Sequence, residues 1–265
     1  MWLIELAFLT IFWTWIACAV LLWRLSLIRA NAQPAPGGAL VWEPVALRAS
    51  DGHPLGAWRL RVPDANAPWV ILCEGPERPG QRLADLAATL QGSGLHVLWL
   101  GFRTQSPGRR RMSSFGLREQ LDVEGALVWL GRQADVSARP YGVYGRAMGA
   151  TAALLVAARD ERIGALIAED PAPSIQAELA RRLHAAGFPG QPFGWFLAAA
   201  YRLRFGAWPV RIRPMVCAEA SQARALRVAH EPVEPAAVSQ FFTQALQRSI
   251  TRRADDRAQT ARAAG

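Results

Sequence analysis

The 265-residue sequence contains no lysine, so all 30 of its basic residues are arginine, against 21 acidic residues and a net charge of +9. Such an excess would indicate nucleic acid or an anionic membrane surface if the arginines were clustered. They are mostly dispersed, and the use of arginine alone is more typical of codon bias than of a selected binding face. Aromatic and basic residues do not interleave as they do on a platform for single-stranded nucleic acid. We therefore expect no nucleic-acid partner.

The densest basic run, Arg109 to Arg111, follows a Ser-Pro-Gly sequence that is typical of a loop. Two interpretations remain open for this run. It is either a solvated loop or a contact for phosphate groups or lipid headgroups.

Cysteine is also scarce. Cys18, Cys73 and Cys217 form neither a paired framework nor the spacing of metal ligands. Cys18 lies in an apolar N-terminal run and the other two lie in strand-like runs, so we expect free, buried thiols. The sequence predicts no metal and no cofactor, and it gives no indication of an oxidising compartment.

Charge is absent from Leu6 to Trp23, a run that would span about 27 Å as a helix, close to the hydrocarbon thickness of a bilayer. Glu5 is the single charged side chain before it, which does not match the basic start of a signal peptide. We expect a retained transmembrane anchor that contacts the lipid bilayer. Arg24 and Arg29 follow the run, so the positive-inside rule places the rest of the chain in the cytoplasm.

The remaining chain divides by composition. Residues 1–30 form the anchor, and residues 31–38 are a linker rich in proline, glycine and small residues. A soluble domain is expected over residues 39–250, since 51% of the chain is hydrophobic and can form a large core. The tail, residues 251–265, is polar and is expected to be disordered.

Periodicity within the domain predicts an α/β fold. Two alternating strands joined by Ser-Asp-Gly form a hairpin signal, and short apolar runs such as "WVILCEG", "LHVLWLGF" and "IGALIAED" then alternate with helical segments. This alternation predicts a mostly parallel sheet with helices on both faces. Two further strands are expected at Met215 to Ala218 and at Ala225 to Ala229.

The stretch "YGVYGRAMGAT" has the outline of a nucleophile elbow, in which G-x-S-x-G turns sharply from a strand into a helix. Small residues at Gly145, Gly149 and Ala150 permit the tight turn and close packing of the helix. From about Val41 to Pro171 the order of segments resembles the α/β-hydrolase fold, in the serine-hydrolase branch that includes Bem46-like and serine-aminopeptidase-like proteins.

The resemblance assigns catalytic roles to positions that this chain has altered. The elbow serine corresponds to Ala147, which has no hydroxyl group. Many members of the family place His-Gly in the loop that supplies part of the oxyanion hole, where this chain has Glu74-Gly75. A carboxylate there would oppose the developing negative charge. The alternative is that Glu74 faces solvent.

The expected acid is also missing, because no aspartate lies between Pro214 and Gln247. Glu219 is the carboxylate nearest to the expected place, and Asp170, after a predicted strand, is an alternative acid in some relatives. His230 lies between a predicted strand and a predicted helix, where the resemblance places the catalytic histidine. As a lone histidine it is either structural or residually functional.

Other nucleophiles lack a visible activating partner. Cys73 precedes the oxyanion-type loop but has no evident base beside it. Ser106, Ser113 and Ser114 surround the arginine run, where turn formation is their ordinary role.

Residues 171–213 are expected to form a lid-like insertion of two helices separated by Gly-Phe-Pro-Gly. Its large apolar side chains either pack on the sheet or form a patch that faces a partner or a membrane. They are Phe188, Phe193, Trp195, Phe196, Tyr201, Phe205 and Trp208.

Three functions follow from these patterns. The first is a degenerate, membrane-anchored hydrolase that has lost catalysis and acts as a binding or accessory subunit beside another membrane protein. The second is an esterase, thioesterase or peptidase with relocated catalytic residues. The third is a ligand-binding protein that uses the former acyl pocket.

Overall fold

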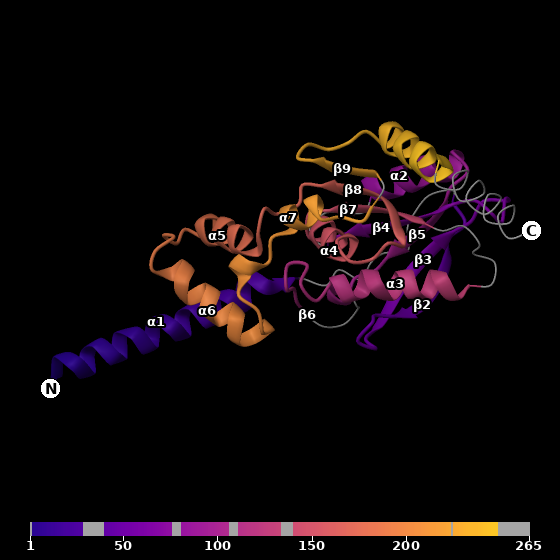
Figure 1. Cartoon of the computed structure of the whole chain (residues 1–265). Coiled ribbons are helices and arrows are strands. Elements are labelled where there is room, and N and C mark those ends of the chain that lie inside the picture. Colours follow the sequence, from indigo (N-terminus) through magenta and orange to yellow (C-terminus); the bar gives the residue numbers. More distant parts are fainter. Residues whose placement is uncertain are drawn as a thin grey trace, which may run out of the picture.

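The computed structural model describes residues 2–28, 40–75, 81–105, 111–133, 140–223 and 225–248. The expected linker and tail, Ser106, and Arg109 and Arg110 of the arginine run lie outside these ranges. A long helix, α1 (Trp2–Ser26), extends away from an α/β body (Figure 1). The described residues form two sheets, and the smaller one pairs β1 (Leu27–Ile28) with β6 (Arg111–Met112).

The main sheet has seven strands in the order β2-β3-β5-β4-β7-β8-β9. The expected hairpin is β2 (Glu43–Arg48) and β3 (Pro54–Leu60), and β3 pairs antiparallel with β5 (His96–Leu100). From β5 onwards the strands run parallel: β4 (Trp69–Glu74), β7 (Tyr141–Arg146), β8 (Ile163–Glu169) and β9 (Ala225–Ala229). This confirms the prediction of a mostly parallel sheet.

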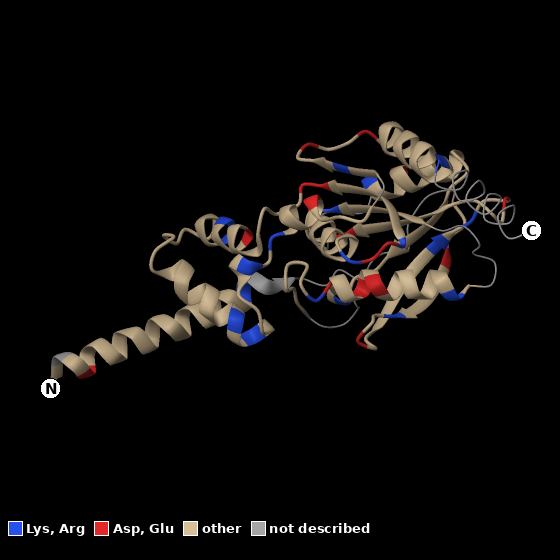
Figure 2. Cartoon of the chain, in the orientation of Figure 1, with Lys and Arg blue, Asp and Glu red and all other residues tan. Residues whose placement is uncertain are grey.

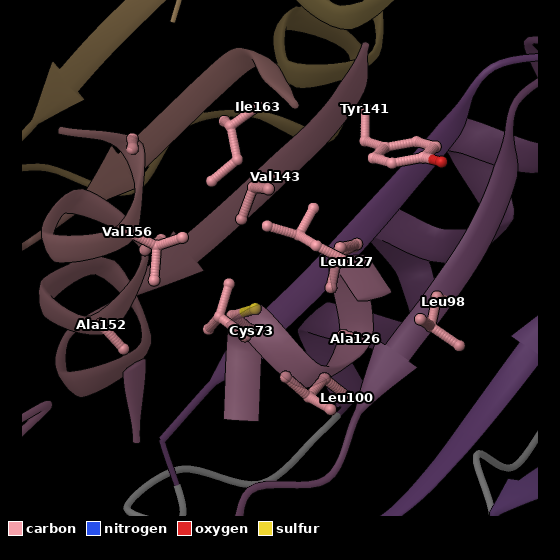
Figure 3. Close-up of a cluster of buried hydrophobic side chains, with 14 of the residues drawn as sticks. Cys73, Leu98, Leu100, Ala126, Leu127, Tyr141, Val143, Ala152, Val156 and Ile163 are labelled. Atoms are coloured by element: carbon pink, nitrogen blue, oxygen red, sulfur yellow. The ribbon is translucent and has the colours of Figure 1, made fainter. Parts of the chain in front are cut away.

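Helices cover both faces of the sheet, as continuous apolar strands require. One face packs against α3 (Gln120–Arg132) and α4 (Met148–Ala157), and Figure 3 shows part of that core. The other face packs against α2 (Gln81–Gly92) and a helix at residues 235–248. Both layers hold fully buried aliphatic side chains, so the sheet is a rigid support for the loops at its ends.

The insertion after β8 forms the two expected helices, α5 (Ile175–Ala185) and α6 (Phe193–Phe205). They pack on each other and α6 packs on α1, which creates a third apolar cluster outside the sheet. Tyr201 is fully buried there, whereas Phe188, Trp195 and Trp208 are exposed. The insertion thus packs on α1 rather than on the sheet, and what its exposed aromatic side chains face stays a prediction.

One predicted element is wrong. Met215 to Ala218 belong to a helix, α7 (Pro214–Glu219), and not to a strand. Proline is favourable at the first position of a helix, and an apolar run of four residues does not distinguish a strand from a helix. The segment packs on α4, and the place beside β8 is taken by β9.

Candidate functional site

The turn between β7 and α4 has the backbone of a nucleophile elbow. Ala147 adopts φ 49° and ψ −114°, a conformation that residues with a side chain rarely adopt. Its amide donates to the Glu169 carbonyl on β8 at 2.8 Å, and its carbonyl accepts the amide of Thr151 at 3.0 Å. The strained turn is thus held from both sides, although the residue at its tip has no atom that can attack a substrate.

Small residues bring α4 against the sheet, as expected from the motif. A Cβ atom at Gly149 would clash with the carbonyl of Cys73 on β4. A Cβ atom at Gly145 would lie 2.7 Å from Ala150 Cα, which real structures do not tolerate. The close packing of α4 therefore depends on glycine at both positions.

A cavity of about 470 Å³ opens above the elbow. Its floor is formed by the ends of β4 and β7 and the start of α4, and its far wall by the segment after β8 and by α5. Its lining residues are Glu74, Gly75, Phe115, Arg146, Ala147, Met148, Thr151, Asp170, Pro171, Ala172, Pro173, Ala177, Glu178, Arg181 and Arg182. A cavity of this size is within the range that holds a small molecule.

Three charged side chains form a row across neighbouring strands, and two of them, Glu74 and Arg146, line the cavity. Glu74, Arg146 and Glu169 are register partners at the ends of β4, β7 and β8. Arg146 Nη1 lies 3.3 Å from Glu74 Oε1, and Arg146 Nε lies 3.1 Å from Glu169 Oε1. All three residues are buried. One arginine thus separates two carboxylates at the strand ends beside the elbow.

Glu74 is only 5% exposed, so the expectation that it faces solvent is wrong. Burial raises the pKa of its carboxyl group to about 7, against the opposing effect of Arg146. The elbow and the loop after β4 therefore meet at a carboxyl group that is easily protonated and that would carry negative charge above neutral pH.

Glu169 is fixed more firmly than Glu74. Its Oε2 accepts the Tyr144 hydroxyl at 2.8 Å and the Val233 amide at 3.1 Å, and Arg82 Nη2 lies 3.4 Å away. Burial and the neighbouring carboxylate raise the pKa of Tyr144 well above its usual range. These contacts tie the sheet to α2 and to the segment before the last helix.

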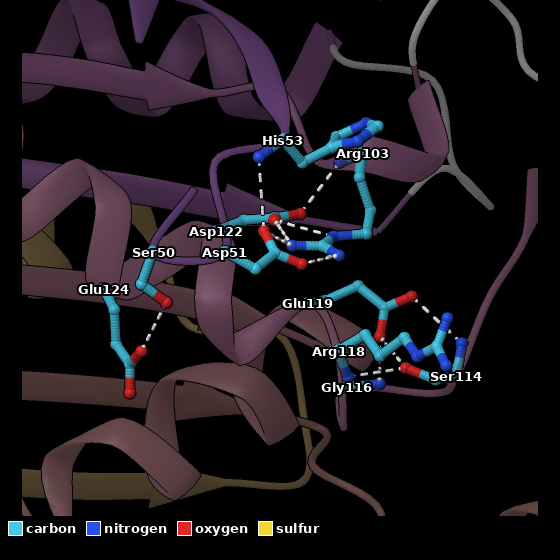
Figure 4. A network of polar contacts seen from close by, with 10 residues as sticks. All are labelled: Ser50, Asp51, His53, Arg103, Ser114, Gly116, Arg118, Glu119, Asp122 and Glu124. Atoms are coloured by element: carbon cyan, nitrogen blue, oxygen red, sulfur yellow. Dashed lines mark hydrogen bonds and ion pairs between the residues drawn. The ribbon is translucent and has the colours of Figure 1, made fainter. Parts of the chain in front are cut away.

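A buried glutamate shapes the loop that brings Phe115 to the cavity. Glu119 accepts the amides of Ser114 and Gly116 at 3.0 and 2.9 Å and the Ser114 hydroxyl at 2.6 Å (Figure 4). The tight loop places Phe115 at φ 58°. Phe115 then stacks with Arg182 of α5, whose guanidinium carbon lies 4.6 Å from the ring centre.

The same view shows a second network farther from the cavity (Figure 4). Arg103 joins Asp51 of the hairpin turn to Asp122 of α3, with N–O distances of 2.8 and 2.7 Å. It links the hairpin turn to α3, and none of its three residues belongs to the cavity lining.

Of the candidate acids and the candidate base, Asp170 alone lines the cavity. Its backbone amide is held by the Ala229 carbonyl at 2.7 Å. His230 and Glu219 are both exposed, and neither belongs to the cavity lining within the described chain. The cavity lining therefore brings together Ala147, Glu74 and Asp170. His230 follows Ala229, the register partner of Glu169, so it lies at the strand end next to Asp170 but does not line the cavity.

The other candidate nucleophiles have structural surroundings. Cys73 is fully buried, and the loss of solvation raises the pKa of its thiol well above the usual range. Ser113 and Ser114 are buried, and both hydroxyls donate to Glu119. Their oxygens also accept the amides of Phe115 and Arg118, which confirms their expected role in turns.

Sequence reasoning missed the charged row and the arginines of α5. Arg146 occupies the variable position of the elbow motif, so the motif assigns it no role. Its contact with Glu169 depends on the register between β7 and β8. Arg181 and Arg182 both contact Glu178 on the same helix, with N–O distances of 2.7 and 2.6 Å, so they read as an ordinary salt-bridged helix face. Among the described residues no cluster of three or more His, Cys, Asp or Glu could hold a metal ion.

Solved structures show the same architecture. The esterase Pf2001 of Pyrococcus furiosus matches with a TM-score of 0.57 and 18% identity, over 78% of this chain and 92% of that chain. The α/β hydrolase GrgF of a Penicillium species matches with a TM-score of 0.51 and 17% identity, over 82% and 97%. This chain has an α/β-hydrolase fold. At these identities the likeness concerns the fold alone.

Similar sequences give less information about activity, and no family model matches the chain. An uncharacterized protein of Mycobacterium tuberculosis is 30% identical over 128 residues, which are 47% of this chain and 45% of that protein. The α/β-hydrolase domain-containing protein WAV2 of Arabidopsis thaliana is 27% identical over 139 residues, 51% of this chain and 44% of that protein. The chain thus spans less than half of the length of these relatives.

Proposed function

We propose that this α/β-hydrolase-like chain is anchored in a membrane, lacks hydrolase activity, and acts as a binding or accessory subunit of a membrane complex. The observation that carries this proposal is Ala147 at the tip of the elbow. A methyl group cannot form the acyl-enzyme, and loss of the nucleophile in a serine protease lowers kcat by on the order of a millionfold.

The charged row supports the same conclusion. Hydrolases stabilise an oxyanion with donors aimed at the place where negative charge develops. Here the end of β4 carries Glu74, whose carboxyl lies against Arg146 beside the elbow. When ionised, this carboxylate would repel an oxyanion and compete with it for the arginine. Restoring one hydroxyl group at Ala147 would leave this obstacle in place.

The anchor is α1, whose residues Ile4–Arg24 are long and apolar enough to cross a membrane. Most of its large side chains, among them Trp2, Phe8 and Trp13, are exposed in the isolated chain. In a bilayer these side chains would meet lipid or the helices of a partner. Arg24 at the end of α1 favours a cytoplasmic domain.

Catalysis is tested with full-length protein in nanodiscs. We expect no turnover of short p-nitrophenyl esters above background and no adduct with a serine-directed phosphonate, by intact mass. The variant A147S should behave in the same way. Turnover or an adduct that accompanies the folded wild-type chain would overturn the proposal.

The presence of a protein partner is tested by photo-crosslinking in the protein's native membrane. The crosslinking residue replaces Trp13, which is 62% exposed on α1. We expect one discrete crosslinked protein. The control site is Ala88, exposed on α2, which should give none. An intact monomer that crosslinks to lipid alone and purifies from mild detergent without another chain would contradict the accessory role.

The cavity supports a second candidate, non-covalent ligand binding. Its volume of about 470 Å³ and its apolar wall suit a compact ligand. That wall includes Phe115, Met148, Pro171, Ala172 and Pro173. Native mass spectrometry after gentle purification should then reveal a bound small molecule. A consistently empty cavity would leave the accessory role as the remaining proposal. Relocated hydrolysis through Asp170 is disfavoured, because His230 lies outside the cavity lining.

A further inference from the structure

We infer that α6, the second helix of the lid, is itself seated in the membrane beside α1, with its arginine-bearing end among anionic lipid headgroups. This inference rests on the proposed anchoring by α1 and adds a second membrane contact from a segment of the folded domain. It gives the lid a lipid partner that an α/β-hydrolase fold alone does not imply.

The first support is the direct contact between α6 and α1. The two helices pack side by side (Figure 1), and Cys18 and Leu22 of α1 are buried there, at 1% and 2% exposure. Cys18 Sγ lies 4.0 Å from the Phe193 carbonyl at the start of α6. If α1 lies in the bilayer up to Arg24, a helix packed on this part of it must lie in the bilayer as well.

The depth of α6 follows from this contact. Cys18 precedes Arg24 by six residues, which is about 9 Å along a helix. With Arg24 at the level of the headgroups, Phe193 at the start of α6 lies about 9 Å below that level. Interfacial helices bury their apolar face by roughly 5–10 Å. The arrangement therefore matches a helix at the boundary between headgroups and acyl chains.

The second support is the apolar surface of the lid. Trp195 is 62% exposed and Leu203 is 71% exposed, both on α6, and Phe188 before α6 is 38% exposed. A groove of about 300 Å³ runs between α1 and α6, lined by Trp15, Ala19, Leu22, Trp23, Met112, Ala200, Leu203 and Arg204. An acyl chain fits a groove of this composition, with a phosphate group at Arg204.

The third support is charge. Between Glu178 and Glu219 the sequence contains no acidic residue and six arginines. Four of them, Arg202, Arg204, Arg211 and Arg213, are exposed on and after the last turn of α6. In Figure 2 the ribbon is blue, for arginine, at this end of α6, while the red positions of acidic residues lie mainly on the body around the sheet. Arginines near a membrane surface attract anionic lipids.

This charge distribution favours a bilayer over a protein partner. A protein that covered only the apolar side chains would not supply an anionic partner to the neighbouring exposed arginines. A bilayer meets the apolar start of α6 with acyl chains and its basic end with phosphate groups. A bilayer alone therefore supplies contacts for both the apolar half and the basic half of α6.

Depth is measured by spin labels on the full chain in nanodiscs that contain phosphatidylglycerol. Cys217, which is partly exposed, is first replaced by serine, and Cys18 and Cys73 are buried. Labels are then placed one at a time by F8C on α1, W195C on α6 and A88C on α2. Collisions with oxygen report lipid, and collisions with a water-soluble nickel chelate report water.

We expect the labels of F8C and W195C to be accessible to oxygen and protected from nickel, and the label of A88C to show the reverse. If F8C lies in lipid and W195C in water, the inference fails while the anchoring stands. If F8C also lies in water, the anchoring itself fails and the inference fails with it. Protection of W195C from both reagents would mean that protein covers α6, which also overturns the inference.

The charge contribution is tested in the same nanodiscs. The double variant R202Q/R204Q should lower the lipid-to-water partition ratio of the W195C label by about fivefold for each arginine at low salt. The matched control R227Q/R248Q removes two exposed arginines from the body and should leave the ratio unchanged. Equal effects of both pairs would contradict a specific role for the end of α6.

Discussion

Arg146 lies 3.3 Å from Glu74 across neighbouring strands, directly beneath an elbow that carries no nucleophile. The same guanidinium also faces Glu169, so one cation compensates two buried carboxylates. The ends of β4, β7 and β8 beside the elbow thus hold a buried ion cluster. Its removal should therefore affect folding.

We predict that R146M lowers the free energy of unfolding by about 3–5 kcal/mol, because it leaves buried carboxylates without their cation. Urea unfolding in detergent micelles, followed by circular dichroism, measures the change. The control is R159M, which breaks the pair of Arg159 with Glu124 at a position where the arginine side chain is 49% exposed. That loss should stay below about 1 kcal/mol, and equal losses would argue against a buried cluster.

The Glu74 carboxyl should make stability depend on pH. Its pKa is raised from 4.5 to about 7 in the folded chain, so between these values the folded state holds a proton that the unfolded state has lost. This contribution is complete below about pH 4.5 and is lost as the pH rises through 7. The variant E74Q should lack it.

The free energy of unfolding of wild type, relative to that of E74Q, should therefore fall by a few kcal/mol between pH 4.5 and 7 and stay level above that. Parallel urea titrations at several pH values measure the difference. A relative stability that stays level over this interval, and rises with pH only below about 4.5, would show that Arg146 holds the carboxylate ionised.

Close packing of α4 on β4 predicts a large effect of one methyl group. The variant G149A should lose about 1–3 kcal/mol or more of unfolding free energy, because its Cβ meets the Cys73 carbonyl. The control G56A lies on β3 with nothing within 4 Å of the added Cβ, and should change stability by less than about 0.5 kcal/mol. Similar values for both would mean that α4 does not pack against β4 in this way.

The strained backbone at Ala147 gives a further test. A147G should be neutral or stabilising, because glycine adopts φ 49° without a steric penalty. The control A153G, in the buried interior of α4, should cost about 1 kcal/mol. A147S should shift stability by less than about 0.5 kcal/mol, since Ala147 borders the cavity. Thermal unfolding compares all three variants, and a loss at A147G equal to that at A153G would rule out strain at the elbow.

Much of the fold could be predicted from local pattern. Buried strands such as Trp69–Glu74 are continuous apolar runs, and the elbow glycines marked the junction between β7 and α4. The prediction of a strand at Met215 to Ala218 was wrong, because four apolar residues fit either a strand or a helix and Pro214 favours the start of a helix. The elbow was found because its residues are consecutive in the chain.

The charged part of the site could not be predicted, because its members are distant in sequence. Glu74 and Arg146 are 72 positions apart, and they meet through the pairing of β4 with β7. The burial of Glu74 depends on its place in the sheet beside Arg146, and the exposure of His230 depends on the course of the chain after β9. Residues 171–213 were expected as a lid, but the contact of α6 with α1 requires the three-dimensional arrangement.

The central claim is that the elbow has kept its geometry without its chemistry. The most direct measurement is the turnover of short p-nitrophenyl esters by folded, full-length wild-type protein in nanodiscs. We predict a rate equal to that of empty nanodiscs at every substrate concentration. Saturable turnover that co-elutes with the folded chain would contradict the claim and would show that another group performs the reaction.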